Sequence, residues 1–302
     1  MSDLYDKAIA GRLYSPMPAA QETTTSVTVT VYNKLPVKVF VYSITSAGTR
    51  SYEGYIAAGA NAAIAGDAGE NFVFTSATSG SFISAYTFPG SNATYTIDSS
   101  VLSEPNNIGP IPQPTQAVPV PVNSPLVMVA CSTVTDINGT VNYITREQYW
   151  NLQGDSYSLT VGESRTVSYT IVAGRQVTSS TEDTVGASVG VDAHAGWGPV
   201  SAGISASLNA QSTTFQQVSV NEQTTTYVSD TVSNASQDDI IVLRWQMTDV
   251  INVYNSTYVP LSSVVSGLNP IVVQHYALGN IEEAFVRPAL VARPPRPQIA
   301  AD

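Results

Sequence analysis

The segment from Thr184 to Gln211 constrains this chain most, because apolar residues alternate along it with polar residues or glycine. The odd-numbered positions are apolar up to Ala195, and the even-numbered positions are apolar from Val200 onward. Alternation with a period of two is typical of a β-strand that has one apolar face. The pattern therefore predicts two amphipathic strands, and the change of parity predicts a turn between them.

A hairpin with Trp197 and Gly198 at its turn satisfies both faces in a single register. The numbers of paired residues then add to 395, so that Val191 faces Ile204. Apolar residues oppose apolar residues along both limbs, as strand pairing over one buried face requires. We therefore predict a β-hairpin over residues 184–211.

The length and charge of the two limbs fit a membrane. Each limb has about 11 residues, the length of a tilted transmembrane strand. Asp192 is the one formal charge between Asp183 and Glu222, and it falls on the polar face. A hairpin that covers an ordinary core has the same period, and this alternative stays open. We expect the hairpin to be stored in the soluble protein and to join a closed barrel with other copies, since closure removes exposed strand edges.

In such a barrel, each residue of the segment faces either the lipid or the water-filled lumen. A Lys or Arg on the lipid face would cost about 2–4 kcal/mol at mid-membrane, and this face carries none. Asp192 in a water-filled lumen should favour cations. The expected lipid-facing residues are Val185, Ala187, Val189, Val191, Ala193, Ala195, Trp197, Val200, Ala202, Ile204, Ala206, Leu208 and Ala210. The expected lumen-facing residues are Thr184, Ser188, Asp192, His194, Ser201, Ser205, Ser207 and Asn209.

Strand signals also dominate the rest of the chain, where Val, Thr, Tyr and Ile alternate between Gly, Pro and Asn turns. Seven prolines between Pro105 and Pro125 indicate an extended connector, because proline donates no ladder hydrogen bond. We predict an all-β fold, with an N-terminal β-sandwich followed by an elongated antiparallel module. The expected parts are an N-terminal segment and candidate activation peptide at 1–24, a sandwich head at 25–104, a Pro-rich linker at 105–126, a module at 127–286 that contains the hairpin 184–211, and a Pro-rich tail at 287–302.

The order of these segments resembles the aerolysin-like β-pore-forming family from about Val127 to Phe285. The Ser- and Thr-rich stretches YSLTVGESRTVSYTIVAGRQVTSSTED and STTFQQVSVNEQTTTYVSDTVSN flank the amphipathic hairpin, and the apolar run DDIIVLRWQMTDVINVY follows them. The resemblance implies a soluble monomer that forms a homo-oligomeric ring on a target-cell membrane and inserts a β-barrel pore. It also implies a toxin-like, cytolytic activity and an unknown receptor, whether glycan, lipid or protein, and it places Trp197 at the apolar tip.

The first sandwich is similar to the β-domain of the von Hippel–Lindau family in its spacing. The similarity lies in Val31 and Asn33, in the Val-x-Val-Tyr strand after them and in the Gly-bounded hairpin that follows. It implies a β-sandwich from about Ser26 to Ser99 and transfers no ligand. In a pore-forming protein we expect such a head to bind the receptor.

The amino-acid composition argues against several other classes of function. The chain carries 12 Lys and Arg against 23 Asp and Glu and has no basic cluster, which argues against nucleic acid as a partner. Two histidines and one cysteine supply no nucleophile–base set and no metal-ligand group, so we expect no enzyme activity, metal or cofactor. A lectin-like carbohydrate-binding module without pore activity stays open, because Tyr149, Trp150 and Trp245 are of the type that stacks on sugars. A structural β protein of an appendage or capsid also stays open.

The two ends of the chain bear on delivery and activation. The start, MSDLYDKAIAGRLYSPMP, contains acids and no apolar stretch of the secretory type. We therefore expect an extracellular protein released in soluble form without a recognisable signal peptide. Every arginine of the C-terminal tail precedes proline, whereas Lys7 and Arg12 do not, so a trypsin-like protease should cut at the N-terminus.

Overall fold

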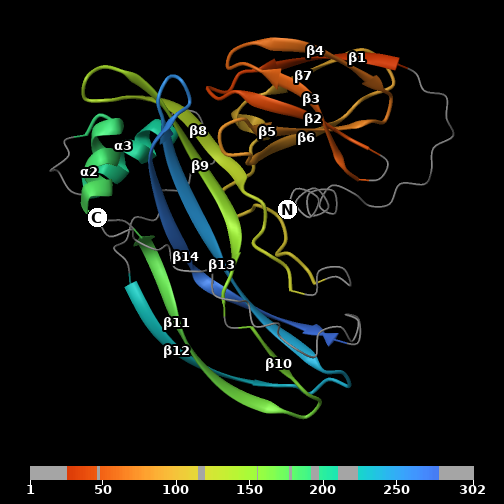
Figure 1. Ribbon diagram of the computed structural model, residues 1–302, viewed down its shortest axis with the longest axis vertical. Coiled ribbons are helices and arrows are strands. Elements are labelled where there is room, and N and C mark those ends of the chain that lie inside the picture. Colours follow the sequence, from red (N-terminus) through yellow and green to blue (C-terminus); the bar gives the residue numbers. More distant parts are fainter. Residues whose placement is uncertain are drawn as a thin grey trace, which may run out of the picture.

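The computed structural model describes residues 26–45, 48–114, 120–154, 156–176, 179–191, 197–209 and 224–278. Most of these residues lie in β-strands, which confirms the all-β class. The molecule is elongated: the head lies at one end, and a long sheet runs from it to the other end (Figure 1).

The head is a two-layered β-sandwich, as predicted. The inward-facing valines of its first two strands meet Phe72 and Phe74 in one buried cluster. Met128 and Cys131 of the next module belong to the same cluster, so the core of the head continues into that module. One layer has the strand order β4 (Asn61–Asp67), β1 (Ser26–Asn33) and β7 (Ala93–Ile97). The other has the order β3 (Arg50–Ile56), β2 (Val39–Ile44), β5 (Asn71–Ser76) and β6 (Phe82–Thr87), and the 3-10 turn η1 (Ser99–Val101) follows β7 in the chain.

The long sheet continues the second layer of the head. β6 pairs in parallel with β8 through Phe82 and Val127. Onward from β6 the order is β8 (Val127–Thr135), β9 (Val141–Leu152), β13 (Ile240–Tyr254), β14 (Pro260–Ala277), β11 (Ser164–Gln176) and β12 (Thr224–Ser233), while the short β10 (Tyr157–Leu159) pairs with β13. The head and the long module therefore share one continuous sheet.

The proline-rich connector lies against this sheet. Its described parts, 105–114 and 120–126, contain no strand, as their prolines predict. The backbone N–H of Ser124 donates to the Trp150 carbonyl (2.8 Å), and the Trp150 N–H donates to Ser124 Oγ (2.7 Å). Ile108 and Ile111 are buried against apolar residues of the long sheet. The connector is thus a packed strap along β9.

The described parts of the segment predicted as a β-hairpin contain helices and no strand. α2 (Ser179–Ser188) covers the start of the first limb, and α3 (Trp197–Asn209) covers the predicted turn and most of the second, so the prediction of strands is wrong for these residues in this conformation. The physical reason is tertiary packing. In the helical form the large aliphatic residues of the segment are buried against the sheet, whereas some of its alanines are exposed. Neither helix, nor any other in the described ranges, combines the length and apolar character needed to cross a membrane.

Candidate functional site

The two helices cover one face of the long sheet with their apolar side chains. In Figure 1 they lie beside the ends of β8 and β9. Fully burying one aliphatic side chain stabilises a fold by about 1.5–3 kcal/mol, so a cluster of this kind holds both helices on the sheet. The helix-side members, each 8% exposed or less, are Val185, Val189, Val200, Ile204 and Leu208. They meet Ala130, Val134, Ile144, Ile251, Val253 and Val264 of the sheet.

The large aliphatic residues of α3 are spaced by four, at Val200, Ile204 and Leu208. Four is an even number, so in a strand all three share one face; four residues are also close to one helical turn, so in a helix they again share one face. The two conformations differ at the residues between them. Ala202 and Ala206 belong to the apolar face of a strand but are exposed on the helix. The sequence is therefore compatible with both forms.

The end of α2 is fastened to the sheet by its backbone. The Asn142 side-chain amide donates to the Ser188 carbonyl (3.1 Å), and the Ile137 N–H donates to the Ala187 carbonyl (3.2 Å). The last carbonyls of a helix lack the usual donor four residues on, and these bonds give the Ser188 carbonyl a donor and the Ala187 carbonyl a second one beside the Gly190 N–H. Sequence reasoning missed Asn142 because it lies 46 residues from its partner and carries no local signal.

Gly190 ends α2 in a left-handed conformation, with φ of 77°. The Val191 N–H donates to the Gly186 carbonyl (2.9 Å) and the Gly190 N–H to the Ala187 carbonyl (3.3 Å), which is the bonding of a glycine-terminated helix. A Cβ on Gly190 would lie 2.5 Å from the Thr135 carbonyl oxygen. Only glycine therefore fits this close approach of helix end and sheet.

The helices themselves have weak local support. Gly186 and Gly203 lie in helix interiors, where glycine is less favourable than alanine by about 1 kcal/mol. The Ser207 hydroxyl bonds back to the Gly203 carbonyl (2.9 Å), and the buried Ser205 hydroxyl has no hydrogen-bond partner among the described residues. An unsatisfied buried hydroxyl costs about 1–3 kcal/mol. The helical form consequently depends on its packing against the sheet.

The remaining residues predicted for this segment fall into three groups. Thr184 is exposed, Ser188 is buried, and Ala187 and Val191 are half-buried. Trp197, Ser201 and Asn209 belong to α3, but their side chains lie outside the described part of the structure. Asp192, Ala193, His194, Ala195 and Ala210 lie outside the described residues, as do Lys7 and Arg12.

A two-stranded ribbon, β11–β12, leads into and out of the helical segment. The two strands pair antiparallel from Ser164 with Ser233 to Ala173 with Thr224, without a register shift. One face carries a ladder of exposed hydroxyl pairs: Ser164–Ser233 (2.8 Å), Thr166–Thr231 (2.8 Å) and Ser168–Ser229 (3.3 Å). On the opposite face the ring of Tyr169 lies under the guanidinium of Arg244 of β13 (3.8 Å to the ring centroid). The body of the molecule therefore lies on the tyrosine side, and the hydroxyl side faces solvent.

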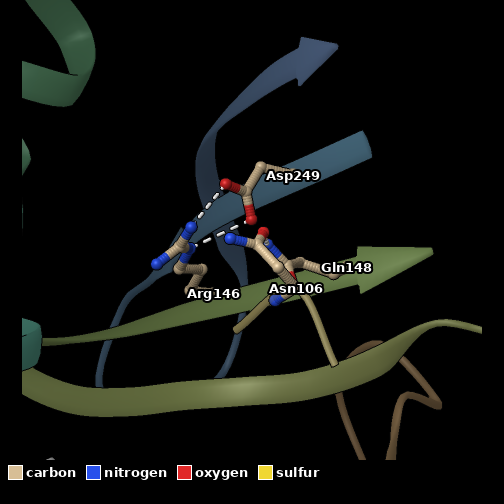
Figure 2. Close-up of polar contacts among 4 residues, drawn as sticks. All are labelled: Asn106, Arg146, Gln148 and Asp249. Atoms are coloured by element: carbon tan, nitrogen blue, oxygen red, sulfur yellow. Dashed lines mark hydrogen bonds and ion pairs between the residues drawn. The ribbon is translucent and has the colours of Figure 1, made fainter. Parts of the chain in front are cut away.

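β9 carries a buried ion pair on its helix-side face (Figure 2). Arg146 Nε donates to Asp249 Oδ1 (3.0 Å) and Nη2 to Oδ2 (2.7 Å), with both side chains at most 2% exposed. Next to it, Gln148 exchanges two hydrogen bonds with Asn106 of the connector. Breaking a buried pair of this kind typically costs about 3–5 kcal/mol, so this face fixes β9, β13 and the connector together.

Glu147 points to the other face of β9, toward the head. It accepts hydrogen bonds from Ser79 Oγ (2.5 Å), Ser81 Oγ (3.1 Å) and Asn252 Nδ2 (3.3 Å). Burial raises the pKa of the Glu147 carboxyl, although these hydrogen bonds partly oppose the shift. Burial, with Glu147 nearby, also raises the pKa of the Cys131 thiol to about 12, so this thiol is unreactive at neutral pH.

The aromatic residues considered for sugar stacking do not form one platform. Trp245 is fully buried. Trp150 is half-buried beside the same cluster, and its indole N–H donates to the Gly109 carbonyl (3.1 Å). Tyr149 instead lines a separate cavity of about 630 Å³ between head and sheet, with Tyr42 and Arg50. Within the described ranges, no three potential metal ligands come together.

No protein-family model matches the chain, and no curated protein matches it in sequence. The solved structures that it resembles include Cry35Ab1, at 11% identity and a TM-score of 0.41, over 78% of this chain and 67% of that one. They also include the oligomeric pore-forming toxin pro-Monalysin, at 12% identity and a TM-score of 0.22, over 52% of this chain and 68% of that one. Scores this low assign neither a family nor a function.

Proposed function

We propose that this protein is a pore-forming protein, released in soluble form, whose residues 184–211 leave the sheet and form a membrane-spanning β-barrel with other copies. One observation carries the proposal: a segment whose two limbs each alternate with a period of two contains helices where the structure describes it. A pair of helices that stays on a sheet permanently needs only a helical pattern of apolar residues. The additional strand pattern has a use only if the segment also forms strands.

The energetics support a release of this kind. The helices combine interior glycines with an unsatisfied hydroxyl, and they depend on one apolar cluster for their position. In a barrel, lipid replaces that cluster around the same aliphatic residues, and strand ladders satisfy every backbone group. Assembly into a ring, receptor binding by the head and cleavage at Lys7 or Arg12 are further parts of the proposal.

Dye release tests the proposal. Purified protein, with and without trypsin treatment, is added to resealed erythrocyte ghosts and to phosphatidylcholine vesicles loaded with carboxyfluorescein. We expect release from at least one of these membranes, and discrete conductance steps in a planar bilayer. Binding to ghosts with no release and no conductance, under both protease conditions, would instead support a lectin-like module.

The cavity between head and sheet supports a binding role for this part of the molecule. Tyr42 and Tyr149 provide aromatic surface and Arg50 a positive charge, next to polar groups such as Ser79 and Asn123. Pockets of a few hundred Å³ with a few converging polar groups are typical of ligand sites. The measurement is a screen of the intact protein on a glycan array, where binding lost in a Tyr149→Ala variant supports a site here.

A further inference from the structure

The ribbon β11–β12 sets a register that the sequence alone does not give. In all ten of its ladder pairs the residue numbers add to 397, as for Ser164 with Ser233 and Ala173 with Thr224. The two strands are joined by the segment that contains both helices. If that segment becomes a hairpin, its limbs extend this ribbon, and strand pairing continues in register unless a bulge intervenes.

When the register that adds to 397 is continued into the segment, residue types of matching chemistry are paired at its start, and a glycine falls in its turn. Beyond the ribbon it pairs Arg175 with Glu222, a charge pair that favours cross-strand contact. At the far end it closes with Trp197 opposite Val200, which leaves Gly198 as the first central residue of a two-residue turn, a position where glycine is favoured.

The register that adds to 395 does less well at its tip. It places Pro199 at the last position of the turn, where a backbone N–H normally closes the hairpin and proline has none. From Ala187 to Ala195 both registers place apolar residues opposite apolar ones, because both sums are odd. They differ at Val185, which faces Ser212 if the sum is 397 and Ala210 if it is 395. The observed ribbon therefore decides between them.

The ribbon also fixes which face becomes the lumen. The hydroxyl face is free of the body of the molecule, whereas Tyr169 on the other face packs against Arg244. A ring of copies can line a channel only with the free face. On β11 the hydroxyl face carries even-numbered residues, and continuing that parity places Glu182 on it, together with Asp192.

We infer that Glu182 is a second selectivity residue of the pore, ten positions from Asp192, and that Glu222 lies on the outer face opposite Arg175. This inference rests on the proposed function. At about 3.3 Å per residue the two lumen carboxylates would lie roughly 33 Å apart along the strand, so Glu182 would form a ring of negative charge at the mouth of the channel. Rings of carboxylates select for cations.

Reversal potentials under a KCl gradient test the assignment, with Glu222 as a matched control for Glu182. We expect Glu182→Gln to lower the K⁺/Cl⁻ permeability ratio at least twofold and Glu182→Lys at least fivefold. Glu222→Gln and Glu222→Lys should leave the ratio within experimental scatter. An unchanged ratio in both Glu182 variants, or an equal change in the Glu222 variants, overturns the assignment.

Disulfide trapping tests the register in assembled pores, in a Cys131→Ala background that first has to release dye like the wild type. Ser188→Cys with Asn209→Cys fits a sum of 397, and Ser188→Cys with Ser207→Cys fits 395. We expect copper-phenanthroline to cross-link the first pair within one chain on phosphatidylcholine vesicles, as read by peptide mapping. Preferential cross-linking of the second pair overturns the register while dye release stays intact, whereas wild-type protein that never releases dye contradicts the proposed function itself.

Discussion

At the scale of single residues, the alanines of α3 distinguish the helical form from the barrel. Val200, Ile204 and Leu208 are covered in the helical form and would be covered by lipid in the barrel, so a change at any of them affects both states. Ala202 and Ala206 are exposed in the helical form, and only the barrel would place them against lipid. Polar substitutions at these alanines should therefore affect formation of the barrel and leave the stability of the helical form nearly unchanged.

We expect Ala206→Lys to leave the soluble protein folded and to reduce dye release at least tenfold. Lysine is a good helix former and the site is exposed, so the change in unfolding free energy should stay within about 0.5 kcal/mol. On the lipid face each copy would bear about 2–4 kcal/mol at mid-membrane, multiplied around the ring. The measurements are thermal unfolding and carboxyfluorescein release.

Ser207→Lys is the control, since the neighbouring position faces the lumen in either register. It loses only the hydrogen bond to the Gly203 carbonyl, so release should persist. If Ala206→Lys releases dye at the wild-type rate, the lipid-facing assignment of that limb is wrong.

At the scale of elements, the helical form of the segment depends on a few contacts between the end of α2 and the turn from β8 to β9. Gly190 allows the close approach to Thr135, and Asn142 and Ile137 satisfy the last carbonyls of the helix. None of these contacts would persist in a barrel. If the segment leaves the sheet as proposed, their strength should set how readily it does so.

We expect Gly190→Ala to speed dye release. A left-handed backbone costs a residue with a Cβ about 1–2 kcal/mol, and here the Cβ also collides with the Thr135 carbonyl, whereas a strand accepts alanine at this position. If this destabilisation enters the release step in full, the rate should rise about tenfold or more. Stopped-flow release at matched protein concentration measures it.

Gly59→Ala, in the turn between β3 and β4 of the head, provides the matched strain without the contact. Gly59 also has a positive φ, 70°, but a Cβ there meets nothing within 4 Å. This variant should lose stability and keep the wild-type rate of release. Equal acceleration in both variants would mean that general destabilisation, and not the fastening of α2, controls release.

At the scale of the whole molecule, Glu147 links the head to the long sheet through Ser79 and Ser81. Its folded-state pKa is raised, so its protonated form is favoured by folding. The stabilisation from this group is fully present below its unfolded pKa and is lost as the pH rises through the folded pKa. The contribution of this junction to the unfolding free energy should therefore be largest in mildly acidic solution.

Urea unfolding at pH 5 and pH 8 tests this dependence. Glu147→Gln removes the titration but keeps a polar side chain of the same size, so its unfolding free energy should change less between the two pH values than that of the wild type. Asp98 is a half-buried comparison, because hydrogen bonds from Ser100 lower the pKa of its carboxyl and therefore act in the opposite direction. If the unfolding free energy of Glu147→Gln depends on pH in the same way as that of the wild type, the Glu147 carboxyl does not contribute to the pH dependence of stability.

Local patterns in the sequence were enough to predict the all-β class and the head sandwich, and they single out residues 184–211, because alternation and proline placement are local properties. Val31 and Val39 take their strand positions from neighbours a few residues away, and residues 184–211 are identified by their own period. The same local pattern allows two hairpin registers, in which paired residue numbers add to 395 or to 397. It also allows helix as well as strand wherever large residues are four apart.

Contacts between distant parts of the chain select among these possibilities. Whether Ile204 is helical depends on an apolar surface supplied by Ile144 and Ile251, and the register favoured for a hairpin depends on a ribbon whose two strands are about fifty residues apart in the chain. The strap formed by the connector, the ion pair of Arg146 and the buried Glu147 also arise from distant partners. Contacts between such distant segments depend on how the strands order in the sheet, and no window of sequence contains that information.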